Sequence, residues 1–211
     1  MGNMSPTLEN LTETIINHLS DQGYAVIENF LPGQEIKALS HHAKSLQKNG
    51  EMHKAATGLS KKNTNNSILR GDFIHWIEAS QACKIEQIYL DSMSSLQQAI
   101  NKSFFLGLFE LESHFAIYPP GAGYQKHFDQ FIGRNERKVS CILYLNEDWT
   151  KDDGGALRMY LDQKNQNNYI DITPQAGTLV VFLSEEFLHE VLPAKRERIS
   201  LTGWFRTRSV N

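Results

Sequence analysis

The sequence contains little cysteine. It has two cysteines among 211 residues, Cys83 and Cys141, and no Cys-x-x-Cys pair. A disulfide scaffold, a zinc ribbon, a dithiol redox motif and a c-type haem attachment site are therefore excluded. We interpret both cysteines as buried or inert thiols in a reducing compartment.

Long apolar runs and an excess of one charge sign are also missing. No stretch approaches the roughly 18 continuous apolar residues of a membrane-spanning helix, and the N-terminus lacks the pattern of a signal peptide. The 21 basic and 24 acidic residues give a formal net charge of −3, which does not indicate a polyanion partner. We therefore predict a cytoplasmic protein with no membrane and no nucleic-acid partner.

Length and composition predict one domain. The chain is 40% hydrophobic and 21% charged, and single cores grow past this size before they divide. We treat residues 1–211 as a single domain. Within it we expect mainly helical support over 1–104, including a mobile substrate loop at about 51–72, and a β-rich core over 105–207.

The first hundred residues favour helices separated by one strand. Apolar positions recur at helical spacing over 8–19, and Gly23 ends that pattern. Residues 24–30 alternate like a strand, Pro32 opens a second helix, and a third is predicted over 84–102. The stretch between the last two helices is rich in Lys, Asn, Ser, Thr and Gly. It predicts a long mobile loop or a hairpin, and long loops inside a domain are typically functional.

From Phe105 onward the sequence predicts short strands. Strand-like runs cover 114–118, 138–145, 156–161, 169–173, 178–184 and 199–207, and Pro- or Gly-containing turns separate several of them. Helices first and many short strands afterwards predict a β-sandwich or jelly roll with helices packed on one face, an α+β arrangement.

Three residues indicate metal chemistry. His127 and Asp129 lie two apart, so on extended backbone they point to the same side, and His189 follows an apolar strand. Two histidines and a carboxylate form the facial triad of non-haem iron(II) oxygenases. A His-x-Asp pair alone is more often a surface ion pair or a buried hydrogen bond, and Glu190 offers His189 a structural partner. We expect both histidines at a solvent-reachable mouth.

A cation and two hydroxyl groups accompany these residues. Arg198 opens an apolar strand, where its planar guanidinium suits a dicarboxylate bound bidentately. Thr202 faces the same side of that strand, and Tyr144 supplies a phenol among apolar neighbours. The alternatives are a solvated charged turn around Arg198 and an ordinary core aromatic at Tyr144.

Together these motifs resemble the 2-oxoglutarate and iron(II)-dependent dioxygenases, and within them the hypoxia-inducible-factor type prolyl hydroxylases. The similar segments are residues 68–76, 118–121, 124–129, 141–149, 154–158, 189–194 and 198–204. The resemblance spans about residues 20–207. It implies a double-stranded β-helix (a cupin-like jelly roll) and a protein prolyl 4-hydroxylase that uses Fe(II), 2-oxoglutarate and O2, with ascorbate as supporting reductant. Similar bacterial proteins imply a proline of elongation factor Tu as the target.

The resemblance also implies a role for each matching residue. The catalytic iron ligands are His127, Asp129 and His189. The 2-oxoglutarate pocket comprises Arg198, Tyr144, Thr202 and Tyr118, and the substrate-binding residues at the base of the 51–72 loop are Arg70, Asp72 and Trp76.

Other polar residues receive no chemical role. We interpret Trp204 as core and His41-His42 as an exposed polar pair without a third metal ligand, and we assign nothing to His75 or His114. Two alternative functions stay open: an oxygenase acting on a free amino acid or other small molecule, and a non-catalytic jelly-roll sensor of iron or 2-oxoglutarate. Nucleic-acid dealkylation is disfavoured, because that branch has a second arginine at the position of Trp204.

Overall fold

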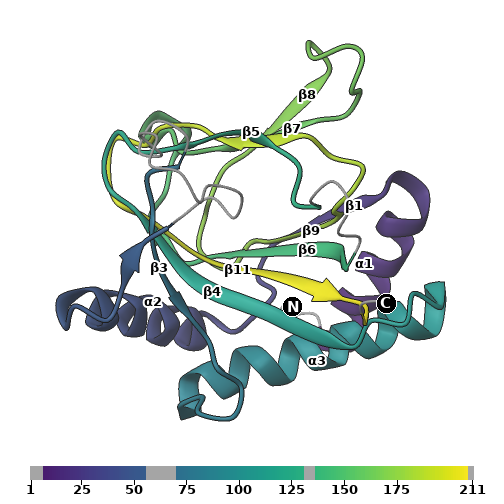
Figure 1. The fold of residues 1–211 in the computed structure, drawn as a ribbon, viewed down its shortest axis with the longest axis horizontal. Helices are drawn as coiled ribbons and strands as arrows, with labels where there is room; N and C mark the ends of the chain where they lie inside the picture. The colour runs from purple at the N-terminus through teal and green to yellow at the C-terminus, as the bar shows by residue number, and fades with distance from the viewer. Residues whose placement is uncertain (1–6, 56–69, 131–135, 209–211) are drawn as a thin grey trace, which may run out of the picture.

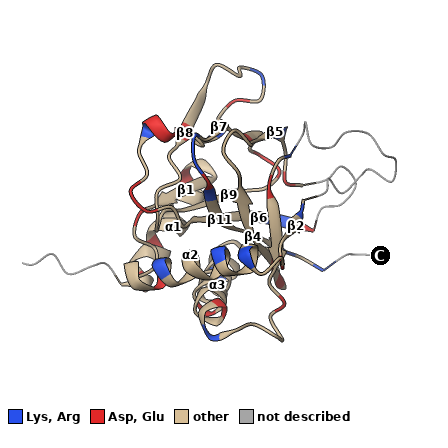
Figure 2. Ribbon diagram, turned by 90° about the vertical axis from the view of Figure 1, so that its left-hand side faces the viewer, with Lys and Arg blue, Asp and Glu red and all other residues tan. Residues whose placement is uncertain are grey.

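The computed structural model describes residues 7–55, 70–130 and 136–208. Most of the expected substrate loop, residues 56–69, lies outside this part. The described chain forms three layers: helices, a seven-stranded sheet and a four-stranded sheet (Figure 1). None of the helices in these residues has the length and apolar character needed to cross a membrane. Basic and acidic residues are spread over all the layers (Figure 2).

Three helices cover one face of the large sheet (Figure 1). They are α1 (Leu8–Gln22), α2 (Gly33–Lys48) and α3 (Lys84–Phe104). Thr7 accepts a hydrogen bond from the Asn10 amide at the start of α1, and Gly23 ends that helix with φ 77°. Pro32 stands immediately before α2. These ends confirm the helices expected from periodicity and capping residues.

The large sheet is antiparallel, in the order β1-β9-β6-β11-β4-β3-β2. The bounds are β1 Tyr24–Ile27, β9 Leu179–Leu183, β6 Arg137–Tyr144, β11 Arg198–Arg206, β4 Glu110–Tyr118, β3 Phe73–Trp76 and β2 His53–Lys54. The short strand β2 lies inside the 51–72 segment and pairs antiparallel with β3, which directly follows it. This pairing agrees with the hairpin alternative for the segment, although neither strand was given bounds from the sequence.

The small sheet is also antiparallel, in the order β5-β10-β7-β8. Its bounds are β5 Tyr124–His127, β10 His189–Val191, β7 Leu157–Tyr160 and β8 Tyr169–Ile172, and a short 3-10 helix, η2 (Lys151–Asp153), precedes β7. β10 has only three residues, too few for an alternating pattern to predict it.

Two apolar cores separate the layers. The larger lies between the helices and the large sheet and includes Leu39, Leu96 and Leu201. The second lies between the two sheets and includes Ile142 and Phe182. Because successive side chains of a strand point to opposite faces, each central strand of the large sheet contributes to both regions.

Candidate active site

Two strands of the small sheet place the predicted histidines side by side. His127 at the end of β5 pairs directly with His189 at the start of β10. Asp129 follows two residues after β5, and its Oδ1 and Oδ2 lie 3.6 Å from Nε2 of His127 and 3.6 Å from Nε2 of His189. The three ligand atoms lie within 4.8 Å of one another. The structure therefore brings all three predicted residues to one point.

Backbone carbonyl groups orient both imidazole rings. Nδ1 of His127 lies 2.7 Å from the Gln125 carbonyl oxygen, and Nδ1 of His189 lies 2.9 Å from that of Phe187. Because a carbonyl only accepts, each Nδ1 carries a hydrogen and donates it, and each Nε2 faces Asp129. Two imidazole nitrogens and one carboxylate match the donor set of non-haem iron(II) centres. These residues fit a ferrous ion.

Asp129 is held by a buried pair of serines. The Ser140 hydroxyl donates to Oδ2 of Asp129 over 2.7 Å and lies 2.8 Å from the hydroxyl of Ser184. Burial raises the pKa of the Asp129 carboxyl, but His189, His127 and the Ser140 hydrogen bond outweigh it and lower that pKa. The carboxylate therefore stays ionised, the form that binds metal. No local motif marked either serine.

The two histidines differ in exposure. His189 is 2% exposed, so the expectation that it lies at a solvent-reachable mouth is wrong, whereas His127 keeps an 18% exposed side chain. The ring of Tyr124 stacks on His127 at 3.6 Å between centroids. Burial lowers the pKa of His127, and His189 lowers it further. The His127 ring is therefore neutral at neutral pH, as a metal ligand must be.

Glu190 is not the structural partner of His189. It points to the other side of β10, as the next residue of a strand must, and accepts a hydrogen bond from the Tyr160 hydroxyl. The alternative of His189 satisfied by its neighbouring carboxylate is therefore wrong.

Arg198 is fully buried. Its residue is 2% exposed, its Nε donates to the Gly155 carbonyl over 2.9 Å, and no salt bridge among the described residues involves it. The solvated-turn alternative is wrong. A buried cation without a carboxylate partner is costly, so this position is prepared for an anion.

Two tyrosines enclose the Arg198 guanidinium. Its central carbon lies 5.1 Å from the ring centroid of Tyr118 and 5.0 Å from that of Tyr144. Burial raises the pKa of Tyr144 to about 12 although Arg198 opposes this shift, so the phenol stays protonated. Arg198 interacts with the Tyr144 hydroxyl, but the hydroxyl meets no partner in good hydrogen-bonding geometry among the described residues. Thr202 is half-buried on the same side of β11 as Arg198.

Glycine allows the close approach that holds Arg198. Gly155 has φ 69°, a conformation that other residues rarely adopt. A Cβ atom there would lie 2.9 Å from the Ala194 side chain and 3.3 Å from Cδ of Arg198. A larger residue at this position would therefore displace the guanidinium.

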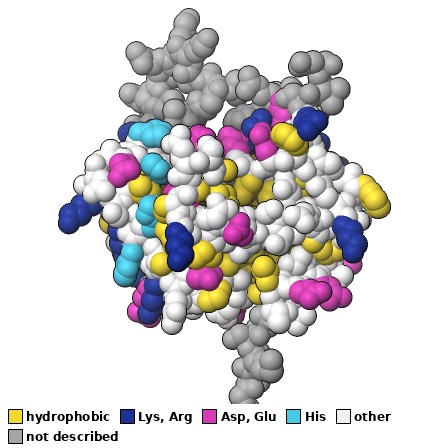
Figure 3. Space-filling model, turned by 90° about the horizontal axis from the view of Figure 1, so that it is seen from below, with side chains coloured by type: hydrophobic (Ala, Val, Ile, Leu, Met, Phe, Trp, Pro, Cys, Tyr) yellow, Lys and Arg dark blue, Asp and Glu magenta, His cyan; other side chains and the backbone are white. Residues whose placement is uncertain are grey.

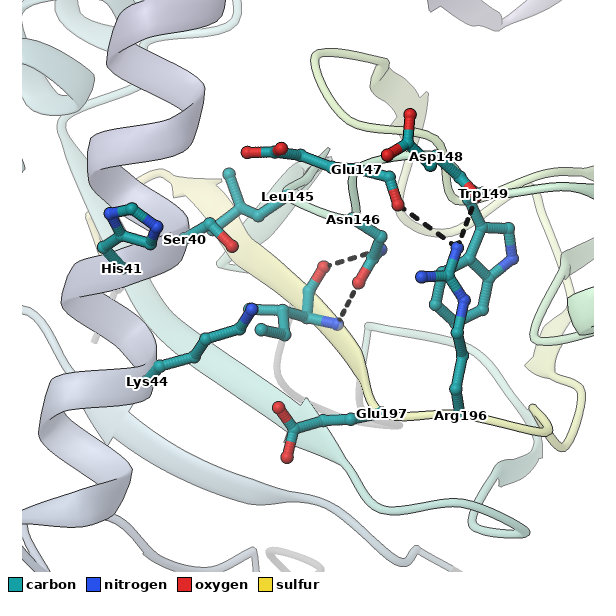
Figure 4. A pocket seen from close by; sticks show the side chains of 11 residues that line it. Ser40, His41, Lys44, Leu145, Asn146, Glu147, Asp148, Trp149, Arg196 and Glu197 are labelled. Carbon is teal, nitrogen blue, oxygen red and sulfur yellow. Dashed lines mark hydrogen bonds between the residues drawn. The ribbon is translucent and has the colours of Figure 1, made fainter.

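A separate cavity of about 400 Å³ lies between α2 and the residues that follow β6 (Figure 4). On its wall the Asn146 side chain accepts from the Ile199 amide over 2.6 Å and donates to the Ile199 carbonyl over 3.0 Å. These bonds fix the residue after Arg198 and so position the start of β11. None of the predicted site residues lines this cavity.

The predicted substrate residues Arg70 and Asp72 bind each other. Nε and Nη2 of Arg70 donate to the two carboxylate oxygens of Asp72 over 2.6 and 2.8 Å, and Asp72 is 0% exposed. Nη2 of Arg70 also lies 3.3 Å from Nε2 of His114. Both charges are satisfied internally, so this pair shapes the site without offering a free charge.

Aromatic rings continue from that pair toward Asp129. The His114 ring lies 4.7 Å from Trp76 and 5.5 Å from Trp204. Burial lowers the pKa of His114 well below its usual value, and Arg70 adds to this. The Trp204 indole helps to lower the pKa of Asp129. The interpretation of Trp204 as core is correct for its burial but misses this neighbour, and the sequence assigned His114 no role.

Comparisons with known proteins agree with this geometry. The family model described as the 2OG-Fe(II) oxygenase superfamily matches residues 113–206. A Pseudomonas putida prolyl-4-hydroxylase structure is 44% identical, with a TM-score of 0.84 over 94% of this chain and 100% of that one. A prolyl hydroxylase structure from Trichoplax adhaerens, in complex with a hypoxia inducible factor peptide fragment, is 26% identical, with a TM-score of 0.83 over 94% and 90% of the two chains. These matches confirm the jelly-roll fold.

Human Egl nine homolog 1 is 31% identical over 208 residues, which is 95% of this chain and 47% of that protein. A Caenorhabditis elegans hypoxia-inducible factor prolyl hydroxylase is 29% identical over 96% of this chain and 29% of its own length. The chain thus spans about half, or less, of the length of these curated relatives.

Proposed function

The chain belongs to the 2OG-Fe(II) oxygenase superfamily and, within it, to the prolyl hydroxylases, and we propose that it is an Fe(II)- and 2-oxoglutarate-dependent protein prolyl 4-hydroxylase. The observation that carries this proposal is the buried guanidinium of Arg198, which has no carboxylate partner among the described residues. A site that bound only a metal cation would not require a buried guanidinium, whereas an anionic cosubstrate would.

In this proposal His127, Asp129 and His189 hold the ferrous ion. The neutral His127 ring and the ionised Asp129 carboxylate are already in the protonation states that binding requires, and the Phe187 carbonyl orients the His189 ring. Iron, 2-oxoglutarate and O2 together supply the decarboxylation of 2-oxoglutarate to succinate and CO2, coupled to hydroxylation of the substrate. The protein supplies orientation and a site from which water is excluded.

Arg198 binds the distal carboxylate of 2-oxoglutarate. Its planar fork pairs with a carboxylate bidentately, and the protonated phenol of Tyr144 supplies a further donor beside it. Thr202 adds a hydroxyl on the same side of β11, and the Tyr118 ring closes the other side of the guanidinium. The ligand converts a buried lone cation into a buried ion pair and so removes the cost of leaving Arg198 unpaired.

The prolyl peptide enters beside the Arg70–Asp72 pair and Trp76. The pair is rigid because both partners are satisfied. The half-buried Trp76, packed beside the buried Trp204, offers an apolar ring suited to a proline. We propose a proline of elongation factor Tu as the target, on the resemblance to similar bacterial proteins, and a cytoplasmic location. We also propose that residues 1–211 act as one domain, because β1, β2 and β3 complete the sheet built by the later strands.

Succinate formation tests the reaction. The protein is incubated with Fe(II), ascorbate and 2-oxoglutarate, with and without proline-containing peptides or elongation factor Tu, and the Asp129→Ala variant serves as control. We expect succinate to rise only with a proline substrate. Succinate that rises with a free amino acid instead supports a small-molecule oxygenase, and no succinate under any condition supports a non-catalytic sensor.

Intact-mass analysis of elongation factor Tu tests the target. We expect a gain of one oxygen atom, located on a proline by fragmentation, after treatment with the wild-type protein and not with Asp129→Ala. If proline peptides stimulate succinate formation but elongation factor Tu gains no oxygen, the reaction stands and this target is wrong.

A further inference from the structure

A second cluster of metal-ligating side chains lies in the helical layer, apart from the proposed iron site. His42 of α2, Cys83 immediately before α3 and Glu86 in the first turn of α3 place three ligand atoms within 4.8 Å of one another. Cys83 is exposed. Cys83 is therefore not buried, and the expectation that His41-His42 has no third metal ligand is wrong for His42.

The distances between these atoms match the edges of a tetrahedral zinc complex. Nε2 of His42 lies 3.1 Å from Oε1 of Glu86 and 3.7 Å from Sγ of Cys83. With Zn–S of about 2.3 Å and Zn–N and Zn–O of about 2.0–2.1 Å, tetrahedral angles give an N···O edge of about 3.3 Å and an N···S edge of about 3.6 Å. The three side chains need little movement to share one ion.

Neighbouring groups hold the Glu86 carboxylate in place. Glu86 is 7% exposed, and its Oε2 accepts the Cys83 backbone N–H over 2.8 Å, which leaves Oε1 toward His42. Burial raises the pKa of Glu86, but hydrogen bonds from the Cys83 backbone and His42 outweigh it and lower that pKa. The His42 ring packs edge-on against Phe115 at 5.5 Å. The ligands are thus oriented by contacts of their own, as in metal sites of known proteins.

Helix capping alone does not account for a cysteine at this position. Cys83 and Glu86 form a capping box at the start of α3, but Ser, Thr, Asp and Asn are the preferred capping residues and sulfur is a weak acceptor. A serine would cap α3 better. What sulfur adds is a soft ligand beside an imidazole and a carboxylate, the donor types that zinc takes in proteins.

We propose that His42, Cys83 and Glu86 bind a zinc ion that ties α2 to the start of α3. Water supplies the fourth ligand, because Cys83 faces solvent. The view from below shows histidine side chains gathered along one edge of the molecule (Figure 3). Cys83 is exposed, so an incoming ion can reach its thiol. The site stabilises the helical layer and does not depend on the proposed oxygenase reaction.

Cobalt absorption tests the thiolate ligand. Co(II) is added to the metal-free full-length protein, and the near-ultraviolet thiolate-to-cobalt charge-transfer band is recorded. We expect the band to saturate at one equivalent bound to this site, to disappear in Cys83→Ser and to persist in Cys141→Ala. Since the His127, Asp129 and His189 set contains no sulfur, binding there does not produce this band. Absence of the band in the wild-type protein would overturn the proposal.

Zinc-dependent melting tests the stabilising role. Both proteins carry Asp129→Ala, so that the proposed iron site does not compete for zinc. We expect zinc to raise the melting temperature of Asp129→Ala but not of Cys83→Ser/Asp129→Ala, with zinc affinity lower by about 100-fold or more, since even an outer-shell partner is worth about 10–100-fold. Because serine is a better capping residue than cysteine, the metal-free melting temperature of Cys83→Ser/Asp129→Ala should be no lower than that of Asp129→Ala. Equal zinc shifts in the two proteins would contradict the assignment.

Discussion

The two faces of the large sheet carry different kinds of side chain. On the helical side, Leu201 and Phe205 of β11 join the larger apolar core. On the side facing the small sheet, the same strand carries Arg198, Thr202 and Trp204, the polar or aromatic residues of the proposed site. One strand therefore contributes to stability and to chemistry through alternate residues.

β4 repeats the comparison. Phe115 and Ile117 join the helical-side core, whereas His114 and Tyr118 face the site. Burial of the apolar residues stabilises the fold. Burial of the titratable residues is unfavourable, because they lose their interactions with water. The comparison shows that the site depends on strand register. A shift of one residue in the pairing would turn the apolar residues toward the site and the site residues toward the helical-side core.

The largest expected effect comes from removing a metal ligand on the site side. His189→Ala should reduce succinate formation to background, because the facial set loses one of its three donors, while the apolar residues stay intact. His41→Ala, on the exposed surface of α2, is the control and should keep full activity. Circular dichroism checks the fold, and an unfolded His189→Ala protein would make that histidine structural instead.

Removing the buried cation should act on cosubstrate binding. Arg198→Ala should raise the 2-oxoglutarate requirement by about 30-fold to several thousand-fold, the equivalent of about 2–5 kcal/mol for a buried charge pair. The free energy of unfolding of the ligand-free protein should change little, because the substitution also removes the desolvation cost of the buried guanidinium. The control is Arg196→Ala, whose guanidinium pairs with Asp153 at the surface. An unchanged requirement in Arg198→Ala removes Arg198 from the site.

A substitution on the helical side of β11 should change stability and leave cosubstrate binding unchanged. Leu201→Ala leaves a cavity in the larger core, where Leu201 is 0% exposed, and should lower the free energy of unfolding by about 2–5 kcal/mol. The 2-oxoglutarate requirement of the folded protein should not change. Urea unfolding and succinate kinetics measure the two quantities. A large change in the requirement would show that the two faces are not independent.

The smallest effect concerns acid stability. The folded protein holds the pKa of His114 well below its usual value, so between the two values the unfolded chain binds more protons. Stability should therefore fall as pH drops below about 6.5, by at most about 1.4 kcal/mol per pH unit from this residue. His114→Gln cannot titrate and should show a shallower decline between pH 7 and 5 in urea unfolding. Equal slopes would mean that His114 does not contribute.

Most helices and strands could be predicted, because their signals are local. Gly23 ends α1, Pro32 precedes α2, and short apolar runs mark β6 and β9. The strands without predicted bounds, β2, β3, β5 and β10, have two to four residues. Strands this short form mainly because a neighbouring strand offers its hydrogen bonds.

The site was predicted in part for the same reason. His127 and Asp129 are close in sequence, His189 and Arg198 each adjoin an apolar strand, and the family resemblance added a role for each. Ser140 under Asp129 and the internal Arg70–Asp72 pair carry no signal of their own. A serine or an ion pair is common everywhere in proteins, and only its neighbours in space give it a role.

By itself the sequence determined what depends on neighbouring residues: helix ends, strand alternation, and the kinds of metal and anion ligand that the chain contains. The tertiary structure alone decided which distant residues meet. It set His127 opposite His189, buried Arg198 without a carboxylate partner among the described residues, and brought His42 to Cys83 across two helices. These long-range contacts depend on how strands pair and layers pack, and no local stretch of sequence contains that information.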